Sequence, residues 1–200
     1  TSANLSDEPI VYQDEEAKSH LSTIADYILS HNRIIQTRVD DSVVRVFNDK
    51  QMLIRRSRGY APSPVLLKGD LISDIPVLAC GPELKNTFCM TKGQKAFLSQ
   101  HIGDLENMAV NNAYKNSIDL FKRLFTIKPK LIACDMHPEY FSTKFAKSYA
   151  QDNDLPLIQV QHHHAHIASV MAEHDLKGDV IGISLDGTGF GDDGRIWGGE

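Results

Sequence analysis

The most unusual stretch of the sequence is a run of histidines after residue 161. Four of the nine histidines of the chain fall within it, at positions 162, 163, 164 and 166. On a helix, His162 and His166 are four residues apart, so both side chains leave the same face. Two imidazoles with this spacing can bind one metal ion, and an imidazole-rich site suits zinc or iron. We therefore predict that His162 and His166 are metal ligands, with a polar helix start as the alternative. His163 and His164 point elsewhere on the helix, which suits contacts around the site better than ligation.

A glycine-rich loop follows this run, beginning at Asp186. A dinucleotide-binding fingerprint needs a helix directly after its glycines, whereas residues 192–197 are typical of a turn into a strand. An EF-hand loop would need acids at alternate positions. We expect Gly187, Thr188 and Gly189 to bind phosphate, and Asp186 to reach the same cation as the histidines. The alternative is a tight hairpin that needs glycine for its backbone angles.

Two other groups of side chains are candidates for phosphate binding. Arg55, Arg56 and Arg58 form a basic cluster that could hold a phosphate through paired hydrogen bonds, although such a run is more often a solvated surface. Lys85 and Asn86 follow a glycine turn after a predicted strand, so they offer a second phosphate contact or only a hairpin.

The bulk composition excludes several classes of protein. The 200 residues, 42% of them hydrophobic, suffice for one or two domains with a real core. A net charge of −5 without basic blocks argues against a nucleic-acid or membrane surface. The three cysteines have no CxxC pairing and no neighbouring base, so we expect reduced thiols in a cytoplasmic protein and no nucleophilic cysteine.

Hydrophobic spacing predicts two regions. The first covers residues 1–64 and contains a helix over residues 14–32 and three short strands, at 34–39, 42–47 and 52–55. Residues 65–75, within a proline-containing segment of weak periodicity, form a predicted linker. The second region covers residues 76–200. Its predicted strands are 77–80, 86–91, 96–99, 131–134, 157–160 and 180–185, and its predicted helices are 106–125, 139–151 and the histidine helix. A hairpin followed by strand–helix alternation indicates a mixed α/β sheet with a parallel part.

Taken in order, several segments resemble the HypF family, the carbamoyltransferases of nickel–iron hydrogenase maturation. The matching stretches are Thr1–Ser6, Asp40–Arg45, Arg55–Pro62, Glu83–Phe88, Ser99–Glu106, Gln161–His166 and Asp186–Glu200. The resemblance implies an α/β fold made of the end of a YrdC-like acyl-adenylate-forming domain, followed by the first half of an actin/hexokinase-type (ASKHA) ATPase domain. The chain then resembles an excerpt of a longer protein.

The resemblance also implies roles for individual residues. Ser2 and Asn4, which alone would suit a helix cap, match a nucleotide-binding motif, and Ser42 and the arginine cluster match later strands of the same domain. His162 and His166 match the metal-binding HxxxH motif. Asp186 falls where the family's next metal or phosphate ligand is expected, and we count it with Lys85 and Asn86 as a catalytic candidate.

The implied reaction uses carbamoyl phosphate and ATP, the latter with magnesium, to form carbamoyl-adenylate. The carbamoyl group then passes to a C-terminal cysteine of a HypE-like partner, as the precursor of the iron cyanide ligands. Adenylation replaces a poor leaving group by AMP, while the arginines, Lys85 and the metal would neutralise charge on phosphate oxygens. The alternatives are a tRNA threonylcarbamoyladenosine-forming enzyme and a non-catalytic metal- or nucleotide-binding module.

Overall fold

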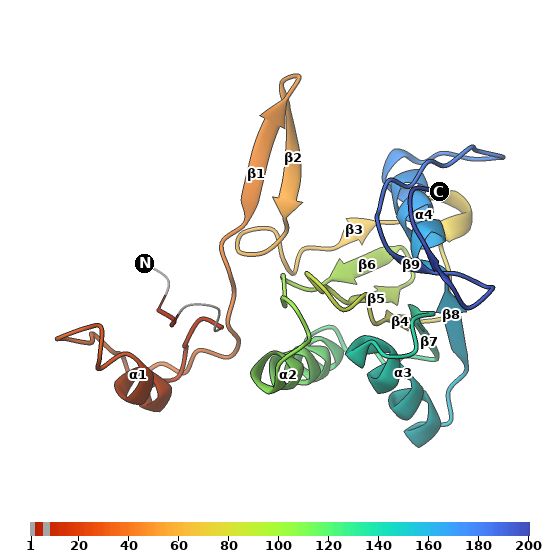
Figure 1. Cartoon of the computed structure of the whole chain (residues 1–200). Helices are drawn as coiled ribbons and strands as arrows, with labels where there is room; N and C mark the ends of the chain where they lie inside the picture. Colours follow the sequence, from red (N-terminus) through yellow and green to blue (C-terminus); the bar gives the residue numbers. More distant parts are fainter. Residues whose placement is uncertain (1–2, 6–8) are drawn as a thin grey trace.

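A computed structural model describes residues 3–5 and 9–200 (Figure 1). Within this part of the chain, the largest sheet has six strands in the order β3-β6-β5-β4-β7-β8. Strand β4 is antiparallel to β5 and parallel to β7, which is in turn parallel to β8. The bounds are β3 Val65–Leu66, β4 Val77–Ala79, β5 Cys89–Lys92, β6 Lys95–Leu98, β7 Leu131–Asp135 and β8 Leu157–Val160. The predicted mixed α/β fold, with a hairpin and a parallel part, is confirmed.

Two helices, α2 (Met108–Leu124) and α3 (Phe141–Asp152), lie along one side of this sheet (Figure 1). Helix α2 begins at a capping residue, Asn107, whose side chain accepts a hydrogen bond of 2.8 Å from the backbone N–H of Val110. Its buried residues, Val110, Tyr114, Ser117, Ile118 and Phe121, recur at helical spacing and so form one face. The polar remainder of the helix faces solvent.

An aromatic cluster joins α2 to the sheet. The ring of Phe88 makes edge-to-face contacts with Tyr114 and Phe121, with centroid separations of 5.9 and 5.0 Å. The buried Tyr114 hydroxyl donates a 2.8 Å hydrogen bond to the carbonyl of Cys80, just after β4. Burial of these rings fixes α2 against the end of β4, where the loop carrying Lys85 and Asn86 begins.

Helix α4 (His162–His174) begins directly after β8, and its first turn carries the histidine run. The side chain of Gln161 caps it by accepting a 2.9 Å hydrogen bond from the backbone N–H of His164. Because β7 and β8 are parallel neighbours, both strands end at the same edge of the sheet, with Asp135 paired to Val160. The start of α4 therefore lies beside the end of β7.

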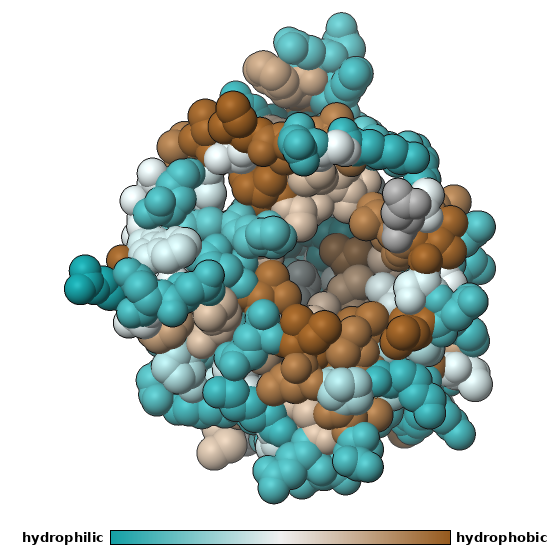
Figure 2. Space-filling model, turned by 90° about the vertical axis from the view of Figure 1, so that its right-hand side faces the viewer, coloured by the Kyte–Doolittle hydropathy of each residue, from teal (hydrophilic) through white to brown (hydrophobic). Residues whose placement is uncertain are grey.

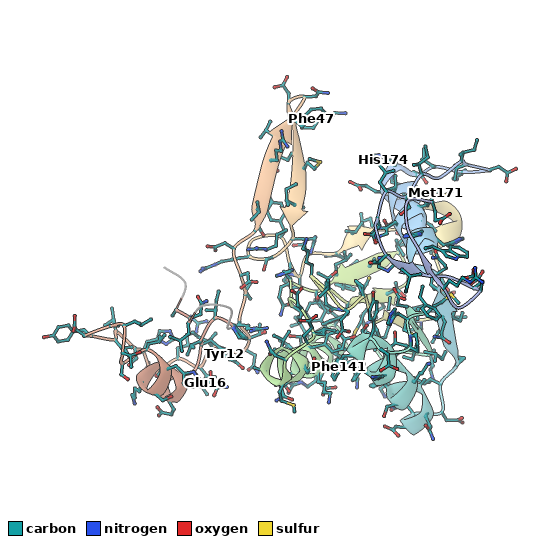
Figure 3. The ribbon with its side chains drawn as sticks, in the orientation of Figure 1. Tyr12, Glu16, Phe47, Phe141, Met171 and His174 are labelled. Carbon is teal, nitrogen blue, oxygen red and sulfur yellow. The ribbon has the colours of Figure 1, made fainter. Side chains whose placement is uncertain are left out.

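The first region departs from the prediction. Helix α1 covers only Asp14–His20, and residues 34–39 form no strand. Ile24 and Leu29, on the predicted continuation of the helix, are 64% and 100% exposed. Helical spacing alone stabilises a helix only weakly, because most of the stability comes from burying the apolar face. The remaining two strands are confirmed as a hairpin of β1 (Val43–Phe47) and β2 (Lys50–Arg55), and Phe47 lies near its tip (Figure 3).

Two other segments differ in whether they pair with a strand. The predicted linker contains a short 3₁₀ helix, Gly69–Leu71, and strand β3, which pairs with β6 and so extends the sheet. Residues 180–185 were expected to form a strand but have no strand partner among the described residues. The apolar side chains of this segment are also uncovered, since Ile181 and Leu185 are 97% and 85% exposed. An apolar run becomes a strand only where a neighbouring strand pairs with it. Figure 2, which views the molecule from the right-hand side of Figure 1, shows apolar residues gathered around a hollow.

No helix of the described residues is both long enough and apolar enough to span a bilayer.

We predict that Phe88→Ala lowers the free energy of unfolding by about 3–5 kcal/mol, because it leaves a cavity between α2 and the sheet. Phe47→Ala is the matched control, since this ring is 61% exposed at the hairpin, and it should change stability by less than about 0.5 kcal/mol. Urea denaturation followed by circular dichroism measures both values. Equal losses in the two variants would contradict the position of Phe88 in the core.

Candidate metal centre

The side chains of His162, His166 and Asp186 converge at the end of the sheet, with one ligand atom of each lying within 4.8 Å of the others. The Nε2 atoms of His162 and His166 are 3.2 Å apart. The Oδ2 atom of Asp186 is 3.0 Å from Nε2 of His162 and 3.6 Å from Nε2 of His166. Two imidazoles and a carboxylate facing one point form a donor set that suits zinc or iron. The residues therefore fit a divalent metal.

The two halves of this cluster are positioned differently. His162 and His166 lie one helical turn apart at the start of α4, where the i, i+4 spacing places their rings 4.8 Å apart at 78° to each other. Asp186 comes from the segment after α4, whose backbone bonds to the end of the chain: the carbonyl of Asp186 accepts from the N–H of Gly199 at 3.0 Å. The His162 side chain is 15% exposed, whereas Asp186 and His166 are 40% and 54% exposed. The centre is thus open to solvent on one side.

A carboxylate that sequence reasoning missed lies against this cluster. Asp135 is the last residue of β7, and its Oδ2 atom is 2.7 Å from Nδ1 of His162. Its other oxygen, Oδ1, accepts a 2.8 Å hydrogen bond from the backbone N–H of His137. The available signal was a carboxylate at the carboxyl end of a buried strand, which is where ligand sites of α/β sheets collect.

The glycine-rich loop leads into a short hairpin of β9 (Gly189–Phe190) and β10 (Ile196–Trp197), so the predicted turn into a strand is confirmed. Gly189 packs against the ring of His163, and a Cβ atom at this position would lie 2.8 Å from Nε2 of His163. His163 is only 4% exposed, and neither ring nitrogen has a hydrogen-bond partner among the described residues. Close packing therefore requires glycine at 189, whereas Gly187 and Thr188 are exposed, with the N–H of Gly187 donating to Oδ1 of Asp186 at 3.0 Å.

Aromatic contacts hold this hairpin against the connection between β7 and α3. The ring of His137 stacks on Tyr140 at 4.1 Å and contacts the edge of Phe190 at 5.4 Å. Burial raises the pKa of Tyr140, and the carboxylates of Asp135, Glu83 and Asp186 raise it further. The Asp186 loop is thus fixed beside β7 by packing, although its own backbone has no strand partner in the described part of the chain.

The loop between β4 and β5 places Lys85 and Asn86 differently from the expectation. Asn86 is fully buried, and its amide nitrogen donates to the carbonyls of Cys80 at 3.0 Å and Pro82 at 2.6 Å. The amide nitrogen therefore braces the loop, whereas the amide oxygen, Oδ1, is buried without a hydrogen-bond partner among the described residues. Lys85 is exposed and has a positive φ of 50°, and its backbone N–H donates to Asp104 at 2.6 Å.

The phosphate candidates Ser42, Arg55, Arg56 and Arg58 lie on or next to the β1–β2 hairpin, which stands apart from α4 in Figure 1. Arg55 and Arg58 are exposed, whereas Arg56 is half-buried and donates to the carbonyl of Ser63 at 2.7 Å. Burial lowers the pKa of Arg56. Ser42 is also held internally, because its hydroxyl donates to the Arg58 carbonyl at 2.9 Å and accepts from a backbone N–H at 2.8 Å.

Of the two N-terminal candidates, Ser2 lies outside the described residues. Asn4 is half-buried and donates a 2.9 Å hydrogen bond to the carbonyl of Leu5.

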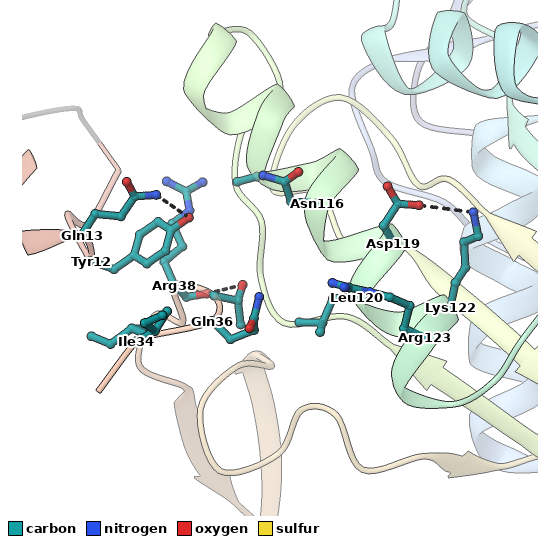
Figure 4. A pocket seen from close by; sticks show the side chains of 13 residues that line it. Tyr12, Gln13, Ile34, Gln36, Arg38, Asn116, Asp119, Leu120, Lys122 and Arg123 are labelled. Carbon is teal, nitrogen blue, oxygen red and sulfur yellow. Dashed lines mark hydrogen bonds and ion pairs between the residues drawn. The ribbon is translucent and has the colours of Figure 1, made fainter. Parts of the chain in front are cut away.

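A cavity of about 670 Å³ separates the N-terminal segment from α2 (Figure 4). Basic side chains, including Arg38, Lys122 and Arg123, line it together with Tyr12 and Asp119. None of the described candidate site residues lines this cavity, so it is distinct from the histidine cluster. Beside the cavity, a hydrogen bond joins the first region of the chain to the second: Arg38 donates to the carbonyl of Ile102 at 3.0 Å.

We predict that Gly189→Ala destabilises the protein by about 1–3 kcal/mol, since the added methyl group overlaps the buried ring of His163. Gly187→Ala is the matched control, because nothing lies within 4 Å of a Cβ at that position. Thermal and urea unfolding of both variants measure the difference. A Gly187→Ala variant as unstable as Gly189→Ala would contradict the packing described here.

Comparison with known proteins identifies the family. Residues 73–173 match the family model described as "HypF Kae1-like domain", and residues 1–57 match one described as "Telomere recombination". The whole chain is 47% identical to Carbamoyltransferase HypF2 of Cupriavidus necator and 45% identical to Carbamoyltransferase HypF of Rhizobium leguminosarum bv. viciae, covering 25% of each. The chain therefore spans about a quarter of the length of the curated relatives it matches.

Solved structures give the same result. The crystal structure of full-length HypF in the phosphate- and nucleotide-bound form superimposes with a TM-score of 0.91 at 53% identity, covering 100% of this chain and 31% of that one. T. kodakarensis HypF superimposes with a TM-score of 0.90 at 45% identity, covering 100% of this chain and 26% of that one. The fold class expected from the resemblance, YrdC-like followed by actin/hexokinase-type, is confirmed by these matches. The chain belongs to the HypF family, whose named members are carbamoyltransferases.

Proposed function

We propose that this protein contributes to a carbamoyltransferase of nickel–iron hydrogenase maturation, which uses carbamoyl phosphate and ATP to form carbamoyl-adenylate. The observation that carries the proposal is the convergence of His162, His166 and Asp186 within the HypF Kae1-like domain. Further support comes from a solved relative that holds phosphate and nucleotide. The proposed division is a YrdC-like part at residues 1–64, a connection at 65–75 and an ASKHA part at 76–200, in line with the extents of the two family matches.

His162, His166 and Asp186 would hold a divalent metal, zinc or iron. When bound, the metal would supply positive charge beside the phosphate or carbamoyl oxygens of the substrate. The exposed residues Gly187 and Thr188 follow directly after Asp186. The N–H of Gly187 donates to Oδ1 of Asp186 at 3.0 Å, so the Thr188 amide would be the donor to phosphate next to the ion. Gly189 has a packing role, and only its backbone groups would contribute to phosphate binding.

The exposed basic groups would bind the anionic substrates. Arg55 and Arg58 at the end of the β1–β2 hairpin would bind nucleotide phosphates, together with Ser2 and Asn4 and with magnesium. Ser42 would act through the backbone that it holds. Arg56 would act through its charge, because Nη2 is bonded to Ser63 and Nη1 is buried. Lys85 would neutralise phosphate charge at the β4–β5 loop, which Asn86 keeps in shape.

The carbamoyl acceptor would be a cysteine of another protein, the C-terminal cysteine of a HypE-like partner. Its thiolate would attack the carbamoyl carbon, and AMP would leave. The cysteines of this chain are unsuited to that step, because burial raises the pKa of Cys80 and Cys89 to about 12 and that of Cys134 to about 11. A thiol is nucleophilic only as the thiolate, so these groups stay inert near neutral pH.

We predict that His162→Ala and His166→Ala each reduce bound metal well below one ion per chain, because each removes one of three ligands. His164→Ala is the matched control, since this side chain is exposed on the same helix and lies outside the cluster. Elemental analysis after metal loading and dialysis measures the content. Full metal occupancy in either variant would show that the substituted histidine is not a ligand.

We predict that the full-length protein catalyses ATP–pyrophosphate exchange only when carbamoyl phosphate is present. Arg58→Ala should slow exchange by about 10–100-fold, because it removes a charge from the phosphate site. Arg45→Ala, an exposed arginine on β1, is the control and should change little. Exchange supported by threonine and bicarbonate would indicate a tRNA threonylcarbamoyladenosine-forming enzyme. Binding of ATP and metal without any exchange would indicate a non-catalytic module.

A further inference from the structure

Asp135 contacts the imidazole of His162 on the edge opposite the candidate metal. Its Oδ2 atom lies 2.7 Å from Nδ1 of His162. The other nitrogen of the same ring, Nε2, faces Asp186 at 3.0 Å and His166 at 3.2 Å. One edge of this imidazole is therefore held by a carboxylate, while the other edge faces the point where the ligand atoms meet.

The position of Asp135 does not depend on α4. The Asp135 side chain is 6% exposed, and its second oxygen accepts a 2.8 Å hydrogen bond from the backbone N–H of His137. The backbone carbonyl of Asp135 accepts a 3.2 Å hydrogen bond from the hydroxyl of Thr143, at the start of α3. A buried carboxylate is tolerated only where hydrogen bonds compensate its lost hydration. These bonds tie Asp135 to β7 and α3, so it presents a fixed acceptor to a ring that belongs to another element.

Carboxylates face both nitrogens of this ring, Asp135 at Nδ1 and Asp186 at Nε2, and a neutral imidazole can donate to only one of them. A cation bound beside Asp186 needs the lone pair on Nε2, so the proton then lies on Nδ1, where Asp135 accepts it. We propose that Asp135 is a positioning residue that holds His162 in the Nδ1–H tautomer and so aims its Nε2 lone pair at the metal. His166 has no hydrogen bond to Nδ1 among the described residues and is 54% exposed. His162 is thus the preorganised ligand of the pair, and His166 the adjustable one.

This inference rests on the proposed metal centre, and cobalt(II) is the probe that tests both. In the full-length protein, Asp135→Asn should weaken cobalt binding about 10–100-fold, because the amide is a weaker acceptor and its NH₂ group favours the other tautomer. The visible absorption bands of the cobalt-loaded variant should also shift, since the ring orientation changes the ligand field. Asp192→Asn is the matched control: it removes an exposed carboxylate from the neighbouring hairpin and should leave the affinity unchanged.

Double variants distinguish a positioning role from a merely structural one. If Asp135 acts through His162, adding Asp135→Asn to His162→Ala should not weaken the residual cobalt affinity further. Adding it to His166→Ala should produce the full loss seen in the wild-type background. Equal losses in both backgrounds would show that Asp135 supports the fold only, and would overturn the inference.

The remaining outcomes separate the two proposals. A wild-type protein that binds no cobalt rejects the metal centre itself, whereas wild-type affinity in Asp135→Asn overturns the role of Asp135 alone.

A measurement on the wild-type protein covers the case in which the variant fails to fold. In ¹⁵N-histidine NMR of the zinc-loaded protein, the signals lost in His162→Ala should show a protonated Nδ1. The Nε2–H tautomer would overturn the inference.

Discussion

The parallel pairing of β7 with β8 is the constraint on which the candidate site depends. It places Asp135 at the end of one strand beside the residue that precedes α4 on the next, with Asp135 paired to Val160. The 2.7 Å contact between Asp135 and His162 follows from that register, because His162 is the first residue of α4. A one-residue slip would turn the Asp135 side chain to the other face of the sheet and remove the contact.

The site then consists of a fixed half and an exposed half. The core beneath β4, β5 and β7 holds Asp135, and through it one ring of the histidine pair. Asp186 and His166 are open to solvent, and Asp186 belongs to a segment held by packing of Phe190 on His137 and by bonds to the chain end. A metal or a substrate can reach such a centre from the open side without disturbing the core. Among the other candidates, Asn86 is buried and Ser42 half-buried, and both brace the backbone, whereas Arg58 and Lys85 are exposed.

Sequence patterns predicted the elements that bury a face and misjudged those that do not. The spacing of α2 and the strands β4 to β8 was read correctly to within a few residues, because each contributes side chains to, or packs against, one hydrophobic core. The same kind of spacing over residues 14–32 gave a helix of only seven residues, and the apolar run at 180–185 gave no strand. In both places the apolar side chains lack a partner surface among the described residues, and periodicity carries no information about whether one exists.

The sequence by itself determined what is local: the spacing of His162 and His166 on one turn of helix, the turn after Asp186, and the family likeness. Only the tertiary structure decided which distant residues join them. It brought Asp186 to within 3.0 Å of His162, added Asp135 from another strand, and gave Asn86 and Gly189 packing roles. The reason is that helical spacing follows from backbone geometry over a few residues, whereas strand register and loop packing depend on contacts far apart in the chain.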